Sequence, residues 1–273
     1  MAKQIKSSSI LCLILIVSLM VVACGSAKDT DATTQNTDAP SQTVELTISA
    51  AASLTNALQD IQTIFETSHS NIKLNFNFAG SGALQQQIEQ GAPADLFLSA
   101  ATKNLQALVD KQLIQESEHM NLLTNELVVI APADSKAHIT NLSDLSQADV
   151  TKLAVGIPES VPAGNYAKEA LTKVNLWDTL QSKIVQAKDV TQVLQYVETG
   201  NVDAGFVYQT DAISSDKVKV ILPVDPTTYT AIEYPMGIIS ATKHREESEA
   251  FYTFLKSEEA LNIFIKYGFS IPK

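Results

Sequence analysis

Apolar and polar positions follow two different periods along most of this chain. Apolar residues that cluster or alternate are typical of β-strands, whereas apolar residues three and four positions apart indicate amphipathic helices. The run 44–49 shows the first pattern. The segment after it shows the second, with apolar residues at Leu54, Leu58, Ile61 and Phe65. Strand-like and helix-like segments continue to alternate to the end of the chain, and this order predicts an α/β fold.

Two similar α/β units follow from this order of elements. In the first unit, the pattern predicts strands at 44–49, 72–78, 96–98 and 127–131, and helices from residue 54 and at 84–91 and 104–113. In the second unit, it predicts strands at 153–156, 184–186, 204–207 and 218–222, and helices at 163–174, 176–183 and 190–198. The chain then returns through 231–240 and ends in amphipathic helices at 246–256 and 258–267.

The final helices have apolar faces that need a partner, which we expect to be the first unit. One lobe would then combine residues 44–130 with the return segment 233–273, and the other lobe would comprise residues 131–232. Two lobes joined by crossovers leave a cleft between them, and small ligands bind preferentially in such clefts.

Residues 1–23 depart from this pattern, because Lys3 and Lys6 precede the apolar run 10–23. A membrane-spanning helix needs about 20 apolar residues. A basic start followed by a shorter apolar run is typical of a secretory signal peptide. We therefore expect residues 1–23 to be removed, although an uncleaved anchor is the alternative.

The sequence VVAC at 21–24 resembles the bacterial lipobox, a motif whose cysteine receives a lipid. Cys24 is therefore expected to anchor the mature chain to the periplasmic side or outer face of the cell membrane; an incidental cysteine is the alternative. Cys12 lies in the segment that is removed, so the mature domain has no thiol for a disulfide. Residues 24–43 comprise Cys24 and a stretch poor in large apolar side chains, which predicts a flexible linker.

Composition and motifs argue against several function classes. The formal net charge is −11, and so acidic a chain is not expected to bind nucleic acid. The sequence has neither a Walker-type phosphate loop nor a dinucleotide fingerprint. Ser81 is not in a nucleophile elbow, because Ala79 stands two positions before it. We therefore expect no enzyme activity and no cofactor.

Histidines give no sign of a metal centre. They fall in predicted loops or at helix ends, at His69, His119, His138 and His244. Scattered acids with so few histidines make a transition-metal site improbable. No metal ion is expected to be bound directly by side chains.

Small polar residues occur where a predicted strand gives way to a helix. Ser53 precedes the helix that starts at Leu54, and Ser81 precedes the helix that starts at Leu84. Each serine is expected to be an N-cap, a role worth about 1 kcal/mol. A second interpretation is that these hydroxyls and the adjacent N–H groups converge on an anion at helix N-termini.

Longer motifs carry a resemblance that covers the chain from about Val44 to its end. They are AASLTNA at 51–57, GAPADLF at 91–97, VPAGNYAKEAL at 161–171, GFVY at 205–208 and YGF at 267–269. In this order and spacing, the chain resembles the periplasmic molybdate-binding proteins of ABC importers, here in a lipoprotein form. The resemblance implies a two-lobed periplasmic-binding-protein fold of type II, with an oxyanion in the interlobe cleft. It also implies a monomer whose partner is an importer permease with its ATPase.

The resemblance places the oxyanion contacts at Ser53, Ser81, Ala163, Val190 and Tyr208. The serines would give hydroxyl and backbone donors, Ala163 and Val190 backbone N–H groups, and Tyr208 its phenol. Without the motifs, Ala163 and Val190 would be ordinary helix starts and Tyr208 a core-edge tyrosine. One departure from some relatives is that glycines flank Ser81, where those relatives carry a run of serines.

None of these positions carries a charged side chain, so recognition would rest on neutral donors and helix dipoles. A site with only donors suits an oxyanion without a proton, such as molybdate, tungstate or sulfate. Molybdate and tungstate follow from the resemblance; the alternative is the same fold binding sulfate or a small organic anion. A lipid-anchored enzyme that uses Ser81 or Tyr208, and a structural lipoprotein, remain as rivals.

Overall fold

The structure is a computed structural model that describes residues 43–272. The expected signal peptide 1–23, the lipid-bearing Cys24 and all but the last residue of the linker 24–43 lie outside the described residues. Between residues 43 and 272, no helix is both long and apolar enough to cross a membrane.

The first sheet has the strand order β2-β1-β3-β10-β4. Its strands are β1 (Val44–Ala51), β2 (Ile72–Ala79), β3 (Leu96–Leu98), β4 (Ile114–Asn125) and β10 (Ile232–Ile239). The helices of this lobe are α1 (Thr55–Ser68), α2 (Ser81–Glu89), α3 (Thr102–Asp110), α8 (Arg245–Leu255) and α9 (Glu258–Lys266). Strands β1, β2 and β3 run parallel, and β10 is antiparallel to both of its neighbours.

The second sheet has the order β7-β6-β8-β5-β9. Its strands are β5 (Leu127–Pro132), β6 (Leu153–Gly156), β7 (Ile184–Ala187), β8 (Ala204–Tyr208) and β9 (Val218–Pro223). The helices are α4 (Pro162–Lys173), α5 (Trp177–Leu180), α6 (Val190–Glu198) and α7 (Gln209–Ile213). Four 3₁₀ turns complete the described elements: η1 (Ala52–Leu54), η2 (Leu142–Ser146), η3 (Gln181–Lys183) and η4 (Pro226–Thr228).

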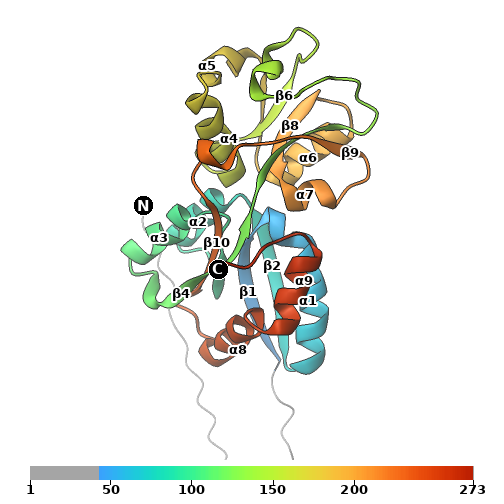
Figure 1. Ribbon diagram of the computed structural model, residues 1–273. Coiled ribbons are helices and arrows are strands. Elements are labelled where there is room, and N and C mark those ends of the chain that lie inside the picture. The colour runs from blue at the N-terminus through green and yellow to red at the C-terminus, as the bar shows by residue number, and fades with distance from the viewer. Residues whose placement is uncertain (1–42, 273) are drawn as a thin grey trace, which may run out of the picture. The chain divides into compact units, whose positions relative to one another are not determined.

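The two sheets form separate lobes, which confirms the predicted two-lobed α/β fold (Figure 1). The final helices pack on the first lobe, as expected, with α9 against α1 and α8 against β1 and β10. Phe65 of α1 is fully buried, and its ring centroid lies 5.0 Å from that of Phe251 in α8. The return segment therefore completes the core of the first lobe.

The crossover between the lobes differs from the expected position. Residues up to 130 were expected in the first lobe, but β5 pairs with β8 and β9 in the second sheet. The crossover therefore lies at Glu126, between β4 and β5. The apolar run 127–131 predicts a strand correctly, but the sheet that a strand joins depends on long-range pairing that the run does not encode.

One strand and one short α-helix, β4 and α7, were not predicted from the sequence pattern. Strand β4 is largely polar and exposed in its first part, and it pairs only with β10 at the edge of its sheet. Edge strands often carry polar and charged side chains, which hides the strand signal. Helix α7 is a single short turn after β8.

The topology gathers helix starts at one edge of each sheet. Strands β1 and β2 lead into η1 and α2 in the first lobe, and β6, β7 and β8 lead into α4, α6 and α7 in the second. In open α/β sheets, ligands bind outside the carboxyl ends of the strands. The edges that face each other across the lobes are thus where a ligand site is expected.

Candidate functional site

A small cavity between the lobes collects all of the predicted oxyanion contacts. It is lined by Ser53, Ser81, Ala163, Val190 and Tyr208 together with neighbouring small and apolar residues. The structure therefore brings these positions together, although their contact with a ligand stays a prediction. The space is about 10 Å³, close to the minimum for one water molecule.

Ser81 is the first residue of α2 and is fully buried. Its expected role as an N-cap is wrong, because Gly80 takes that position. The Ala100 N–H donates to Ser81 Oγ over 2.9 Å. A backbone N–H can only donate, so Ser81 must accept here and its own proton is left for another acceptor. Because Ser81 lines the cavity, that proton is available to a ligand there.

Ser53 is the middle residue of the 3₁₀ turn η1, two residues before α1 begins at Thr55. Its expected role as an N-cap is also wrong, because the N-cap of α1 is Leu54 and no side chain caps that helix. Ser53 Oγ instead lies 2.9 Å from Tyr234 Oη of β10. The residue is partly buried and faces the cavity.

Ala163 and Val190 bring helix starts from the second lobe. Ala163 follows Pro162, the first residue of α4, and Val190 is the first residue of α6. N–H groups in the first turn of a helix have no acceptor within the helix. Since proline has no N–H, Ala163 supplies the first donor of α4. The dipoles of both helices favour negative charge at these ends.

Tyr208 ends β8 and is 1% exposed. Its hydroxyl is buried and has no hydrogen-bond partner within residues 43–272. An unpaired buried polar group costs about 1–3 kcal/mol. Burial raises the pKa of the Tyr208 phenol well above its ordinary value, so the hydroxyl keeps its proton. The cavity is therefore lined by a hydroxyl, that of Tyr208, which can donate a hydrogen bond to a ligand.

Asp211 holds the backbone of Tyr208 in place. Its Oδ2 accepts a hydrogen bond from the Tyr208 N–H over 3.0 Å. The residue is 7% exposed, and burial raises the pKa of its carboxyl to about 7. Asp211 lines a second cavity that shares Ser53 with the first. Sequence reasoning missed this residue, since an Asp three positions after a strand carries no distinctive local signal.

The glycines that flank Ser81 have a geometric role. A Cβ atom at Gly82 would lie 2.8 Å from Ser160 Cα of the second lobe, and one at Gly80 would lie 2.8 Å from Ser160 O. The Gly82 N–H donates to the same Ser160 O over 2.9 Å. Any side chain at these positions would therefore push the lobes apart. The departure from a run of serines is explained by close contact between the lobes.

A second contact joins the lobes beside the cavity. Tyr166 of α4 is buried, and its hydroxyl donates to Ala100 O over 3.3 Å. Ala100 thus bonds both to a predicted contact of the first lobe, Ser81, and to the opposite lobe.

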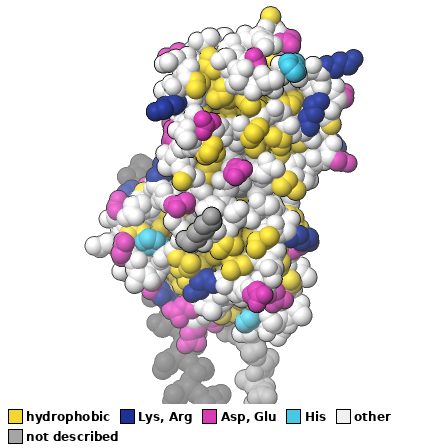
Figure 2. All heavy atoms as spheres, in the orientation of Figure 1, with side chains coloured by type: hydrophobic (Ala, Val, Ile, Leu, Met, Phe, Trp, Pro, Cys, Tyr) yellow, Lys and Arg dark blue, Asp and Glu magenta, His cyan; other side chains and the backbone are white. Residues whose placement is uncertain are grey.

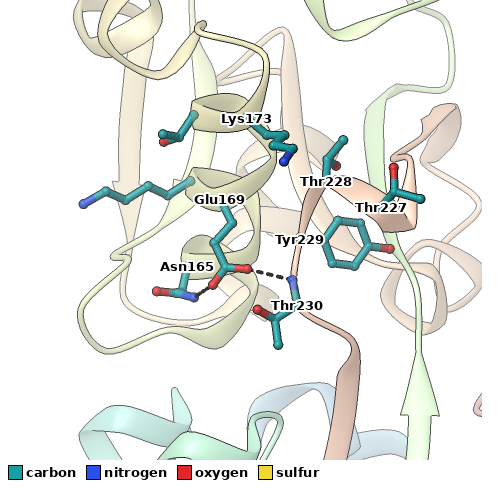
Figure 3. A pocket seen from close by; sticks show the side chains of 9 residues that line it. Asn165, Glu169, Lys173, Thr227, Thr228, Tyr229 and Thr230 are labelled. Carbon is teal, nitrogen blue, oxygen red and sulfur yellow. Dashed lines mark hydrogen bonds between the residues drawn. The ribbon is translucent and has the colours of Figure 1, made fainter.

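A larger pocket lies outside the predicted site. It has a volume of about 590 Å³ and lies between α4 and the segment that leads into β10 (Figure 3). The Glu169 carboxylate in it accepts from Asn165 Nδ2 over 2.5 Å and from the Thr230 N–H over 2.7 Å. This carboxylate is therefore engaged in tying α4 to the returning chain. Nothing in this open pocket matches the buried, unpaired donor found at Tyr208.

Charged side chains are absent from the described lining of the cavity and scattered over the surface seen in Figure 2. No lysine, arginine, aspartate or glutamate lines the cavity among the described residues. On the face shown in Figure 2, basic and acidic side chains lie singly or in small mixed groups rather than in one basic patch. The arrangement can therefore hold an anion only through neutral donors and helix ends.

Comparisons with known proteins give a family for this chain. Residues 46–270 match the family model described as bacterial extracellular solute-binding protein. The chain is 46% identical to the putative ABC transporter substrate-binding lipoprotein YvgL of Bacillus subtilis strain 168, over 97% of this chain and 98% of that protein. It is 42% identical to the molybdate-binding protein ModA of Escherichia coli K12, over 83% of this chain and 89% of that protein.

A solved structure is similar over the same region. The substrate-binding domain of a putative molybdenum ABC transporter from Clostridium difficile is 45% identical, with a TM-score of 0.65. The match covers 85% of this chain and 100% of that one.

Proposed function

We propose that this chain, which belongs to the family of bacterial extracellular solute-binding proteins, captures molybdate, and tungstate as well, and delivers it to an ABC importer. Within that family it groups with the ModA proteins. Its relatives are transporter components and not enzymes. The chain would act as a monomer and without a cofactor.

The observation that carries the proposal is a cavity between the lobes where uncharged hydrogen-bond donors from both lobes meet. The hydroxyls of Ser53, Ser81 and Tyr208 and the helix starts at Ala163 and Val190 surround it. Each hydrogen bond to a charged ligand is worth about 1.5–3 kcal/mol. With no carboxylate among the described lining residues, a proton on the ligand would find no charged acceptor there, only hydroxyls and backbone groups. A fully deprotonated tetrahedral anion fits these constraints.

Capture requires the lobes to move. The present cavity holds about one water molecule, and a tetrahedral anion with four oxygens needs more room. The anion would enter while the lobes are apart, and the donors of both lobes would then close on it. Hinge motion of this kind uses a few residues in the crossing segments, here the crossover at Glu126 and the segment that leads into β10.

The lipid on Cys24 would keep the chain at the membrane that holds its permease. The lipobox-like sequence at 21–24 supports this part of the proposal. A lipoprotein name for the Bacillus subtilis relative supports it as well. The linker 24–43 would let the closed form reach the permease on the extracytoplasmic face.

Calorimetric titration of the purified full-length chain tests the ligand. We expect tight binding of molybdate and tungstate, and binding of sulfate and phosphate that is weaker by at least about a hundredfold. Ser248→Ala is a suitable control, because Ser248 is a fully buried serine of α8 outside the cavity. Heat from sulfate or phosphate with none from molybdate would reject the proposed ligand.

A further inference from the structure

A chain of hydrogen bonds connects the crossover between the lobes with Ser53. We propose that Asn125 and Tyr234 are positioning residues that turn the Ser53 hydroxyl so that its proton points at the bound oxyanion. This inference rests on the proposed function, since it concerns the same cavity. Neither residue was singled out by the sequence pattern, and neither lines the cavity itself.

The orientation of the Asn125 amide is fixed chemically. The Glu126 N–H donates to Asn125 Oδ1 over 2.9 Å, and a backbone N–H can only donate. The other end of the amide must then be the NH₂ group. It donates to Tyr234 Oη over 3.3 Å and to Thr210 Oγ1 of the second lobe over 2.9 Å.

The direction of the next bond follows from the first. Tyr234 Oη accepts from Asn125, so its single proton is free to be donated to Ser53 Oγ, 2.9 Å away. Tyr234 is 2% exposed, and burial raises the pKa of its phenol well above the ordinary value, so the proton is retained. Ser53 is then an acceptor toward Tyr234, and its own proton is available to the cavity.

The Ser81 hydroxyl also accepts one hydrogen bond and keeps its proton available to the cavity, but its partner is different. Its Oγ accepts from the Ala100 N–H, which is fixed by the backbone. Ser53 depends instead on side chains of β4 and β10, the strands that connect the lobes. Because Asn125 also bonds to Thr210 of the second lobe, the direction of the Ser53 hydroxyl is tied to the arrangement of the lobes.

The direction of the Ser53 hydroxyl affects which anions the cavity can bind. A serine that is free to rotate can donate to a deprotonated oxygen or accept from a protonated one. When Ser53 accepts from Tyr234, one of its lone pairs is occupied and its proton points at the cavity, so donation to a deprotonated oxygen is favoured over acceptance from a protonated one. The Asn125–Tyr234 chain therefore biases the cavity against oxyanions that carry a proton, such as hydrogen phosphate.

Tyr234→Phe tests the chain while keeping the ring that packs against Tyr208 and Phe269. We expect about fivefold weaker molybdate binding and more effective competition by hydrogen phosphate at pH 8. Ser53→Ala removes the end of the chain, so Tyr234→Phe should cause no further loss in that background. Tyr252→Phe, a half-buried tyrosine of α8, is the matched control.

Asn125→Asp reverses the polarity with almost no change in shape. A carboxylate at this position can only accept, so Tyr234 would donate to it and Ser53 would donate to Tyr234. The Ser53 lone pairs would then face the anion, and molybdate binding should weaken by more than about tenfold. An effect of the added charge alone would persist when Tyr234→Phe is added, whereas an effect through the chain should largely disappear.

The outcomes separate this inference from the proposed ligand. Titration of the wild-type full-length chain with molybdate, tungstate and sulfate identifies the anion to use with the Ser53→Ala and Tyr234→Phe variants and their double mutant, which together form a double-mutant cycle. Binding of sulfate alone would reject the proposed ligand and leave the cycle to be run with sulfate. Additive losses for Ser53→Ala and Tyr234→Phe, with unchanged competition by phosphate, would overturn the inference while the ligand stands. A wild-type chain that bound none of these anions would contradict both.

Discussion

The two lobes supply the cavity with different kinds of donors. The first lobe offers hydroxyls, at Ser53 and Ser81, whose protons must be turned toward the ligand by other groups. The second lobe offers the starts of α4 and α6, at Ala163 and Val190, where helix geometry fixes the N–H direction. Among the described residues that line the cavity, Tyr208 is the one side-chain donor from the second lobe.

The difference teaches which changes can damage each half of the site. A hydroxyl is lost with its side chain, and it works only if its neighbours set its direction. A backbone N–H survives almost any substitution except proline. The first lobe is therefore expected to be sensitive to side-chain chemistry, and the second to backbone chemistry and to the distance between the lobes.

Asp211→Asn changes the residue that accepts the Tyr208 N–H and so holds this donor of the second lobe in place. The folded pKa of about 7 lies above the ordinary value of 3.8, so the folded state holds a proton that the unfolded state releases between these values. The resulting stabilisation is complete below pH 3.8 and is lost as the pH rises through 7. Relative to the variant, the wild-type free energy of unfolding should fall by up to roughly 4 kcal/mol over this range.

Urea unfolding of both proteins at pH 5 and pH 8 measures the part of that change above pH 5, which should be roughly 2.7 kcal/mol. The comparison with Asp211→Asn cancels carboxylates elsewhere whose pKa is lowered by hydrogen bonds, such as Asp203. A difference between the two proteins that is the same at both pH values would contradict a buried, protonated Asp211.

Ser81→Ala should have the largest effect on binding. The variant loses a donor to the anion and leaves the Ala100 N–H without its acceptor. Hydrogen bonds to charged groups are worth about 1.5–3 kcal/mol, so affinity for molybdate should fall by about 10- to 150-fold. Calorimetry measures the loss, with Ser248→Ala as the control. Wild-type affinity in the variant would show that the first lobe does not bind through this hydroxyl.

Val190 provides a matched pair for the second lobe. Val190→Ala keeps the N–H and should change affinity by less than about threefold, whereas Val190→Pro removes it and should cost about tenfold or more. Proline is well tolerated at the first position of a helix, and Asp189 before it already has an extended backbone, with φ −159° and ψ 171°. Equal affinities in calorimetry would argue against a backbone donor at this position.

Gly82→Ala tests whether binding depends on the distance between the lobes when no donor is removed. The new Cβ would lie 2.8 Å from Ser160 Cα, so the contact between Gly82 and Ser160 would be lost and the donors of the two lobes would lie further apart around the anion, although every donor is still present. We expect about tenfold weaker molybdate binding and an almost unchanged melting temperature of the free protein. Small-angle scattering with molybdate should show less compaction than in the wild type. Full compaction with normal affinity would mean that this contact is not needed.

Much of the fold can be predicted from the sequence because its strands and helices are strongly periodic. The buried positions of α1, such as Leu58 and Phe65, follow directly from their spacing. The missing strand, β4, is a polar edge strand whose pairing partner β10 lies more than a hundred residues further along the chain. The crossover was misplaced for a related reason, since sheet membership is decided by pairing and not by local composition.

The site shows the same limit more sharply. Ala163 and Val190 contribute only backbone groups, so their side chains carry no signal, and only the resemblance in the motifs pointed to them. Tyr234 is 181 residues away from Ser53 in the sequence, and no local pattern connects them. The serines were assigned to helix caps because their bonds to Ala100 and Tyr234 are long-range contacts.

A crystal structure of the chain grown with molybdate tests the central claim most directly, because molybdenum can be located by its anomalous scattering. The account predicts a single strong peak in the cavity between the lobes. The oxygens around it should lie within hydrogen-bonding distance of the hydroxyls and N–H groups at Ser53, Ser81, Ala163, Val190 and Tyr208. A peak elsewhere, or a molybdate-soaked crystal with the Tyr208 hydroxyl still unpaired in an empty cavity, would contradict it.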